Sequence, residues 1–227
     1  MKKNITFLFC SFLFFANLNA QVDPLIERVN NKLSQVDDYV AEGIMKTNVS
    51  FIKASLGKVK VYFKKPHFFT IKKESGISLL PKGGISMTLG SIVNIKNYTS
   101  FHAGNEVLNG KTLAVVKIIP NDANIDWVLS TLWIDPVEAL VYKTMTTTKD
   151  NGSYEIAMQY GAYAKYGLAS KIVFSFNTKN YKLPNGITLE FGDDNMTEKT
   201  SKIKTNKGSI EISYSNYLIN KGLPSKI

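Results

Sequence analysis

The chain has 227 residues, of which 44% are hydrophobic and 20% charged, a composition that excludes a disordered or fibrous protein and suits one ordinary globular domain. Its 28 basic residues outnumber its 18 acidic residues and give a formal net charge of +10. Arg28 is the only arginine. Because the arginine guanidinium is the group that grips phosphate bidentately and reads guanine edges, a charge made of lysines disfavours sequence-specific nucleic-acid recognition.

The first twenty residues have the pattern of a secretory signal peptide. Two lysines precede an apolar run over residues 5–16, which is too short to span a membrane, and residues 18–20 resemble the site that signal peptidase cuts. We therefore expect cleavage after Ala20, a mature chain that begins at Gln21, and a periplasmic location. Cys10 is the only cysteine and would leave with the signal, so the mature chain would have neither disulfides nor thiolate ligands.

One helix followed by a series of strands is expected in the mature chain. Asp23 followed by Pro24 is a typical capped helix start, and apolar residues then recur at helical spacing, at Leu25, Ile26, Val29, Leu33 and Val36. From Tyr39 onward the period changes to two, which predicts strands. These strands cover residues 39–53, 58–64, 68–73, 111–119, 127–134, 139–147, 154–160, 168–176, 187–191 and 209–217, and residues 86–95 are a candidate second, short helix.

Strands in this number, with little helix between them, predict a mainly β (α+β) protein. Their spacing favours an antiparallel barrel or a strongly curved sheet over βαβ units. No linker or change of composition divides the chain, so we expect residues 21–227 to form a single domain.

Residues that could carry catalytic chemistry are scarce. His67 and His102 are the only histidines, and neither belongs to an H-E-x-x-H spacing. The chain has no nucleophile elbow and no phosphate-binding loop motif. The aspartate pairs at 37/38 and 193/194 are adjacent, so in an extended chain their carboxylates point to opposite faces. We expect no enzymatic activity, no cofactor and no metal site.

Large apolar side chains of one parity recur along the predicted strands and should face the interior. That interior is either a filled core or an apolar cavity covered by the leading helix. In the second case the lid residues would be Ile26, Val29 and Leu33. The residues expected to line the cavity and bind lipid are Tyr39, Met45, Val49, Phe51, Val61, Phe63, Ile156, Met158, Ile172 and Phe174.

Three stretches of the sequence resemble the LolA family of periplasmic lipoprotein carriers and its relatives among outer-membrane lipoprotein-sorting proteins. They are the leading helix over residues 23–36, the sequence GKVKVYFKKPHFF at 57–69, and TLWIDP at 131–136, which runs on to VYK at 141–143. The resemblance implies an unclosed, strongly curved antiparallel β-barrel with an N-terminal helix and a short helical lid over an apolar cavity that shelters acyl chains. Carriers of the well-known type place an arginine in the strand after the K-x-P turn, whereas this chain has Phe68-Phe69-Thr70-Ile71 there.

The resemblance leaves three functions open. As a carrier, the protein would bind lipoprotein acyl chains or phospholipid as a monomer, take them from an inner-membrane donor and pass them to an outer-membrane acceptor, with no nucleic acid involved. An RseB-like sensor would use the same hollow to detect mislocalised lipid or envelope stress. A structural module would have a filled core.

Overall fold

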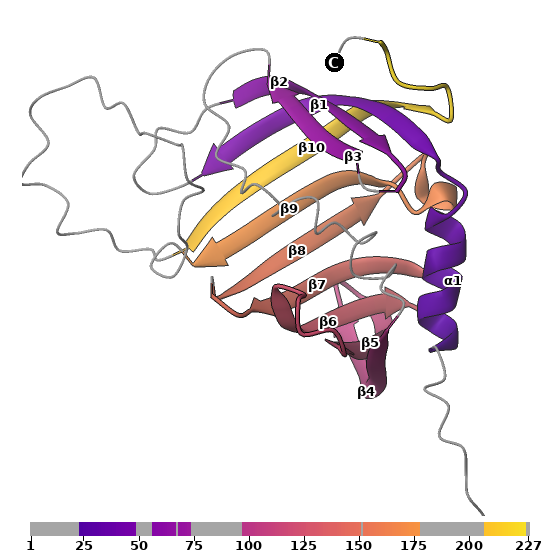
Figure 1. The fold of residues 1–227 in the computed structure, drawn as a ribbon, viewed down its shortest axis with the longest axis vertical. Coiled ribbons are helices and arrows are strands. Elements are labelled where there is room, and N and C mark those ends of the chain that lie inside the picture. The colour runs from indigo at the N-terminus through magenta and orange to yellow at the C-terminus, as the bar shows by residue number, and fades with distance from the viewer. Residues whose placement is uncertain are drawn as a thin grey trace, which may run out of the picture.

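The fold consists of one α-helix, one 3₁₀ turn and a ten-stranded antiparallel sheet, seen in a computed structural model that describes residues 23–48, 56–66, 68–73, 97–150, 152–177 and 207–225. Figure 1 shows the helix running across one end of the strands. The elements are α1 (Pro24–Leu33), β1 (Asp38–Asn48), β2 (Leu56–Lys64), β3 (Phe68–Lys73), β4 (Tyr98–Leu108), β5 (Lys111–Pro120), β6 (Trp127–Asp135), β7 (Leu140–Thr148), β8 (Ser153–Tyr160), η1 (Ala164–Tyr166), β9 (Ala169–Asn177) and β10 (Lys207–Ile219).

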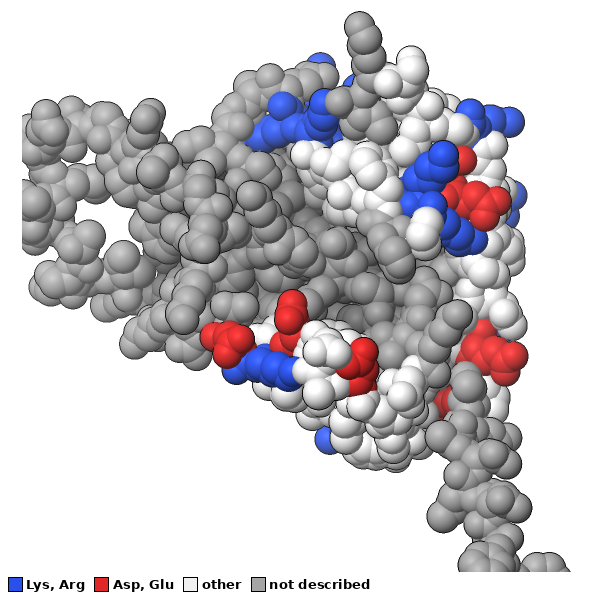
Figure 2. Space-filling view, in the orientation of Figure 1, with Lys and Arg blue, Asp and Glu red and all other residues white. Residues whose placement is uncertain are grey.

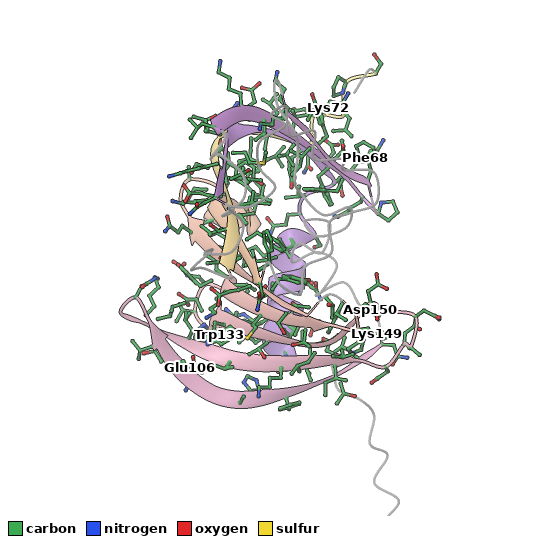
Figure 3. The ribbon with its side chains drawn as sticks, turned by 90° about the vertical axis from the view of Figure 1, so that its left-hand side faces the viewer. Phe68, Lys72, Glu106, Trp133, Lys149 and Asp150 are labelled. Atoms are coloured by element: carbon green, nitrogen blue, oxygen red, sulfur yellow. The ribbon has the colours of Figure 1, made fainter. Side chains whose placement is uncertain are left out.

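The strands form an open sheet in the order β3-β2-β1-β10-β9-β8-β7-β6-β5-β4. Each neighbouring pair is antiparallel, and the pairing of β1 with β10 joins the N-terminal strands to the end of the chain. Figure 3 shows that the sheet curls into a C shape, with β3 near one end and β4 at the other. The prediction of an unclosed, strongly curved antiparallel sheet is therefore confirmed.

Helix α1 begins where the sequence predicted and ends earlier. The Asp23 carboxylate accepts hydrogen bonds from the backbone N–H groups of Leu25 (2.8 Å) and Ile26 (3.3 Å), which satisfies donors that have no partner within the helix. The helix stops at Leu33, so the expected helix over residues 23–36 is too long. Val36 lies in the turn into β1, where it is buried in a small cluster with Tyr217 and three other residues.

Strand β4 was not predicted from the sequence. It is an edge strand whose residues are mostly exposed, so its side chains do not alternate between apolar and polar. Gly104 has a positive φ of 96°, and the register shifts between His102 and Asn105, which breaks the period further. The predicted strand at 187–191, the short helix at 86–95 and the end of the first strand at 49–53 lie outside the described residues.

The two faces of the sheet differ in chemistry. The concave face and α1 share a core that includes Ile26, Met45, Leu132 and Phe174, each at most 2% exposed. On the opposite face, neighbouring strands are joined by the ion pairs Lys60–Glu42 (3.0 Å), Lys143–Glu155 (2.8 Å) and Lys171–Glu211 (2.8 Å). Figure 2 also shows acidic and basic side chains next to one another around the visible rim.

Candidate functional site

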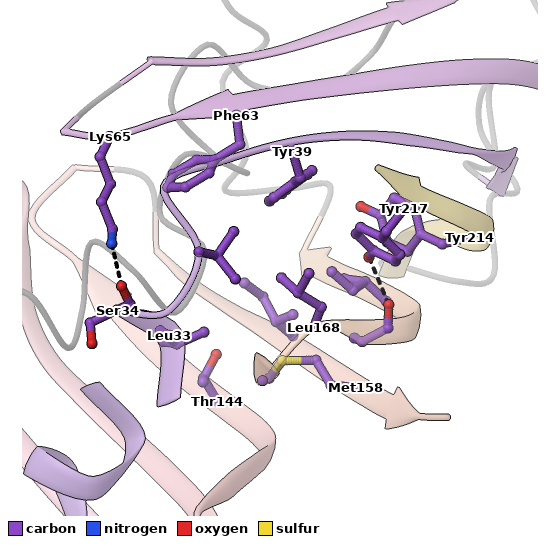
Figure 4. Close-up of a pocket in the computed structure, with 15 residues that line it drawn as sticks. Leu33, Ser34, Tyr39, Phe63, Lys65, Thr144, Met158, Leu168, Tyr214 and Tyr217 are labelled. Atoms are coloured by element: carbon purple, nitrogen blue, oxygen red, sulfur yellow. Dashed lines mark hydrogen bonds between the residues drawn. The ribbon is translucent and has the colours of Figure 1, made fainter. Parts of the chain in front are cut away.

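The candidate site is an apolar cavity of about 130 Å³ on the concave side, where the end of α1 meets the sheet. Leu33 closes it from the helix, and Gly167 and Leu168 close it from the turn after η1. Ser34, Val36 and Lys65 contribute from the turns beside α1 and β2. The strands form most of the remaining wall, as Figure 4 shows, and their lining residues are Tyr39, Phe63, Thr144, Ile156, Met158, Ala169, Ile172, Tyr214 and Tyr217.

Aromatic rings make up one wall of the cavity. Tyr39 stacks on Phe63 with ring centroids 5.2 Å apart, and Tyr217 packs against Tyr39 at 5.4 Å and Tyr214 at 5.2 Å. The Tyr217 hydroxyl donates to the Ala169 carbonyl at 2.7 Å, so its polar end is satisfied while its ring faces apolar neighbours. Burial raises the pKa of Tyr39, Tyr214 and Tyr217, and these phenols remain neutral at physiological pH.

Among the described residues that line the cavity, Lys65 is the one that carries a charge, and it lies at the rim. The Lys65 ammonium lines the cavity and donates to the Ser34 carbonyl at 2.6 Å and to the Asp37 carboxylate at 3.1 Å. Both charged side chains of this pair are substantially exposed, and the bond to Ser34 ties the turn after β2 to the end of α1. The rim could therefore accept a polar head group while the interior accepts hydrocarbon.

Polar contacts hold α1 across the ends of the strands. At its start, Asp23 is 3.0 Å from His102 on β4. In its middle, Arg28 donates to the carbonyls of Pro136 and Val137, each at 2.7 Å. In its last turn, Lys32 donates to the Glu138 carbonyl at 2.5 Å. The single arginine thus fastens the helix to the turn between β6 and β7.

The W-I-D-P motif at 133–136 ends β6 and leads into that turn, where its role is structural. The Asp135 carboxylate accepts from the backbone N–H groups of Val137 (2.9 Å) and Glu138 (3.0 Å). Burial opposes ionisation of Asp135, but these N–H groups and the nearby Lys111 ammonium hold its pKa below the ordinary value. The carboxylate shapes a turn whose carbonyls face α1, and this turn follows the strand that the sequence predicted over residues 127–134.

The residues predicted to line a cavity separate into three groups. Tyr39, Phe63, Ile156, Met158, Ile172 and the lid residue Leu33 line the cavity. Met45, Val61 and Phe174 face the same side but are packed in the core, as are the lid residues Ile26 and Val29. Val49 and Phe51 lie outside the described residues.

Sequence reasoning missed Tyr214, Tyr217, Leu168 and Thr144. Tyr214 and Tyr217 have opposite parity, yet both reach the cavity because the register between β1 and β10 shifts near Gly43. A Cβ at Gly43 would lie 2.5 Å from the Ser213 carbonyl oxygen, so the close approach of the two strands requires glycine there. In the sequence, Gly43 was a possible signal of an irregularity in the strand, whereas nothing about Thr144 indicated that its side chain faces a cavity.

The described residues that line the cavity offer mainly apolar contact. Across the described ranges, no three His, Cys, Asp or Glu side chains come together where a metal ion could be held. No helix in those ranges is long and apolar enough to cross a membrane.

Comparisons with known proteins place the fold. No protein-family model matches the chain, and no curated protein matches its sequence. Among solved structures, the chain is similar to a domain described as an outer membrane lipoprotein-sorting protein from Vibrio parahaemolyticus (TM-score 0.54, 12% identity, 88% of this chain and 94% of the other covered). It is also similar to a DUF1329 family protein from Desulfovibrio piger (TM-score 0.54, 13% identity, 88% and 92% covered) and to a LolA superfamily protein from Nitrosomonas europaea (TM-score 0.50, 11% identity, 89% and 94% covered).

This chain has a LolA-like fold. At these identities the likeness concerns the fold, and it extends over nearly the whole length of each neighbour. The resemblance noted in the sequence is therefore confirmed at the level of architecture.

Proposed function

We propose that this chain is an exported, periplasmic carrier that shelters the acyl chains of lipids or lipoproteins. The observation that carries the proposal is the apolar cavity between the concave face of the sheet and the end of α1, with its aromatic wall and the Lys65 ammonium at its rim. The similarity of the fold to a lipoprotein-sorting domain supports the same function. A structural module with a filled core would have no use for this hollow.

The energetics of acyl transfer suit such a site. Each buried methylene contributes about 0.8 kcal/mol, so a chain of about 16 carbons represents on the order of 12 kcal/mol before ordering costs. A carrier must also release its ligand, which favours adaptable walls over a rigid slot. Met158, Leu33 and the aromatic residues provide side chains that can shift to different rotamers.

The cavity must widen to hold a whole acyl chain. Its volume of about 130 Å³ is below the roughly 300–1,000 Å³ typical of ligand pockets. The first two turns of α1 are fixed in the core through Ile26 and Val29, whereas Leu33 and the turn at Gly167 border the hollow. We infer that opening occurs at this end, by displacement of the last turn of α1 from the turn at 163–168.

The remaining parts of the proposal concern location and partners. The N-terminal pattern supports export and cleavage after Ala20, leaving residues 21–227 as one domain. A monomer would take its ligand from an inner-membrane donor and pass it to an outer-membrane acceptor. Because Lys65 stands at the rim, anionic lipid head groups could be steered toward the opening.

Three measurements test the carrier. Mass spectrometry of the purified mature protein should find co-purified acyl lipid, and a fluorescent apolar probe should bind and be displaced by phospholipid or lipopeptide. Loaded protein should then transfer the lipid to acceptor vesicles. Failure of any apolar probe to bind a well-folded sample would contradict the proposal, and binding without transfer would point to a sensor instead.

A further inference from the structure

One buried polar group in the cavity has no partner. Thr144 on β7 is 1% exposed and lines the cavity, and among the described residues none offers its hydroxyl a hydrogen bond. Figure 4 shows the hydroxyl directed into the space beneath Leu168 and beside Leu33. Buried hydroxyls without a partner are uncommon, since each one has lost its bonds to water without replacement.

The register of the sheet explains why Thr144 has no partner among the described residues. Its cross-strand neighbours on the concave face are Leu132 on β6 and Ile156 on β8, and both are apolar. Two residues further along the same strand, Thr146 pairs with Ser130 instead, and their hydroxyl oxygens are 2.9 Å apart. The two threonines share strand, face and burial, and they differ in that only Thr144 opens onto the cavity.

The chemistry around Thr144 restricts what could satisfy it. An anionic group would need a cation inside the cavity, but the ammonium of Lys65 is at the rim and already contacts Ser34 and Asp37. A neutral carbonyl oxygen accepts a hydrogen bond from a hydroxyl without that cost. Acyl carbonyls lie between a hydrocarbon tail and a polar head, which matches an apolar cavity with a charged rim.

We propose that Thr144 donates a hydrogen bond to the acyl carbonyl of the bound lipid and so sets the depth and chemical class of the ligand. The tail would extend along the wall made by Tyr214 and Tyr217, and the head would lie toward Lys65. This inference rests on the proposed function, and it adds that the site distinguishes acyl compounds from plain hydrocarbon. The carbonyl could belong to an ester-linked lipid, or to a free fatty acid that binds in its neutral, protonated form.

Competition binding with three ligands of equal chain length tests the proposal. The assay measures how well each ligand displaces a fluorescent apolar probe, and the ligands are methyl dodecanoate, dodecanoic acid and dodecane. It compares the mature protein with Thr144→Val, a substitution that keeps the shape of the side chain and removes the hydroxyl. We expect the substitution to weaken binding of the ester about threefold to tenfold and to leave dodecane unchanged. A free acid affected as much as the ester would show that either source of the carbonyl is accepted, and an unaffected acid would restrict the site to esters.

Matched variants separate this role from effects on folding. Thr146→Val removes a satisfied hydroxyl and should lower stability without changing the ratio of ester to dodecane affinity. Thr47→Val removes another buried hydroxyl without a partner, one that does not line the cavity, and should also leave that ratio unchanged. If Thr144→Val folds poorly, Thr144→Ser should keep the ester preference that Thr144→Ala loses.

The outcomes also separate this inference from the carrier proposal. If all three ligands bind and Thr144→Val changes their affinities equally or not at all, the role of Thr144 is wrong and the carrier proposal stands. If none of them displaces the probe from the unsubstituted protein, both are wrong.

Discussion

Leu33 and Ile26 lie on the same face of α1 but should respond differently to truncation. Ile26 is fully buried in the main core, whereas Leu33 is half-buried and borders the cavity. Truncation of Ile26 to alanine should therefore cost about 2–5 kcal/mol of unfolding free energy, the range for fully buried aliphatic residues. Truncation of Leu33 removes three carbon atoms at about 0.8 kcal/mol each, and its partial exposure lowers the expected loss to about 2 kcal/mol.

The order of the two variants should be reversed for ligand release: Leu33→Ala should have the larger effect on the release rate, although Ile26→Ala has the larger effect on stability. Leu33→Ala enlarges the cavity where opening is proposed, so a bound acyl probe should be released several-fold faster. Ile26→Ala should leave the release rate close to that of the unsubstituted protein. Denaturant unfolding gives the stability of each variant, and stopped-flow transfer of a fluorescent acyl probe to vesicles gives the release rate.

A single result would refute this reasoning. If Ile26→Ala accelerates release while Leu33→Ala does not, the ligand does not enter at the end of α1, and the whole helix acts as the lid. Because globular domains are typically stable by about 5–15 kcal/mol, we expect both variants to fold and the comparison to be made on native protein.

The remaining predictions concern backbone, charge, pH and processing. Gly167→Ala should lower the unfolding free energy by about 1–2 kcal/mol because φ is 71° there, and it should weaken probe binding because the new Cβ would lie 2.9 Å from the Leu33 side chain. Gly222→Ala is the matched control: φ is 79° and no atom lies within 4 Å of the new Cβ, so it should show the same strain and unchanged binding. Arg28→Met should lower the unfolding free energy by about 1 kcal/mol, since it removes two exposed charge-assisted bonds to the β6–β7 turn, and equal denaturation midpoints would show that this contact contributes nothing. Burial raises the pKa of Tyr154 from 10.0 to about 12, so the stabilisation by its neutral phenol should be intact below pH 10 and lost as the pH rises through 12, which lowers the unfolding free energy by about 3 kcal/mol. Tyrosinate absorbance and unfolding should be measured together over this pH range. The same alkaline loss of stability in Tyr154→Phe would contradict this prediction. Intact-mass analysis of the exported protein should show a chain that begins at Gln21, and a diacylated form that begins at Cys10 would make it membrane-anchored instead.

The local pattern of the sequence determined most of the secondary structure. Asp23 and Pro24 marked the start of α1 because their chemistry satisfies the first turn of a helix without tertiary contacts. Strands buried on one face, such as β1 and β8, were found because alternation records burial directly. Strand β4 was missed because an edge strand exposed along most of its length carries no such alternation.

The site was decided by tertiary structure. The sequence placed Phe63 and Phe174 on one interior face, but only the curvature of the sheet and the position of α1 left Phe63 beside a cavity and Phe174 in packed core. The shift of register opposite Gly43 brought Tyr214 and Tyr217 to the same wall, although their spacing in a regular strand would point them to opposite faces. Thr144 and Thr146 look alike in the sequence. They differ because the cross-strand register places a serine opposite Thr146 on β6, whereas the neighbours of Thr144 are a leucine and an isoleucine. The periodicity of one strand does not encode which residue of a neighbouring strand lies opposite.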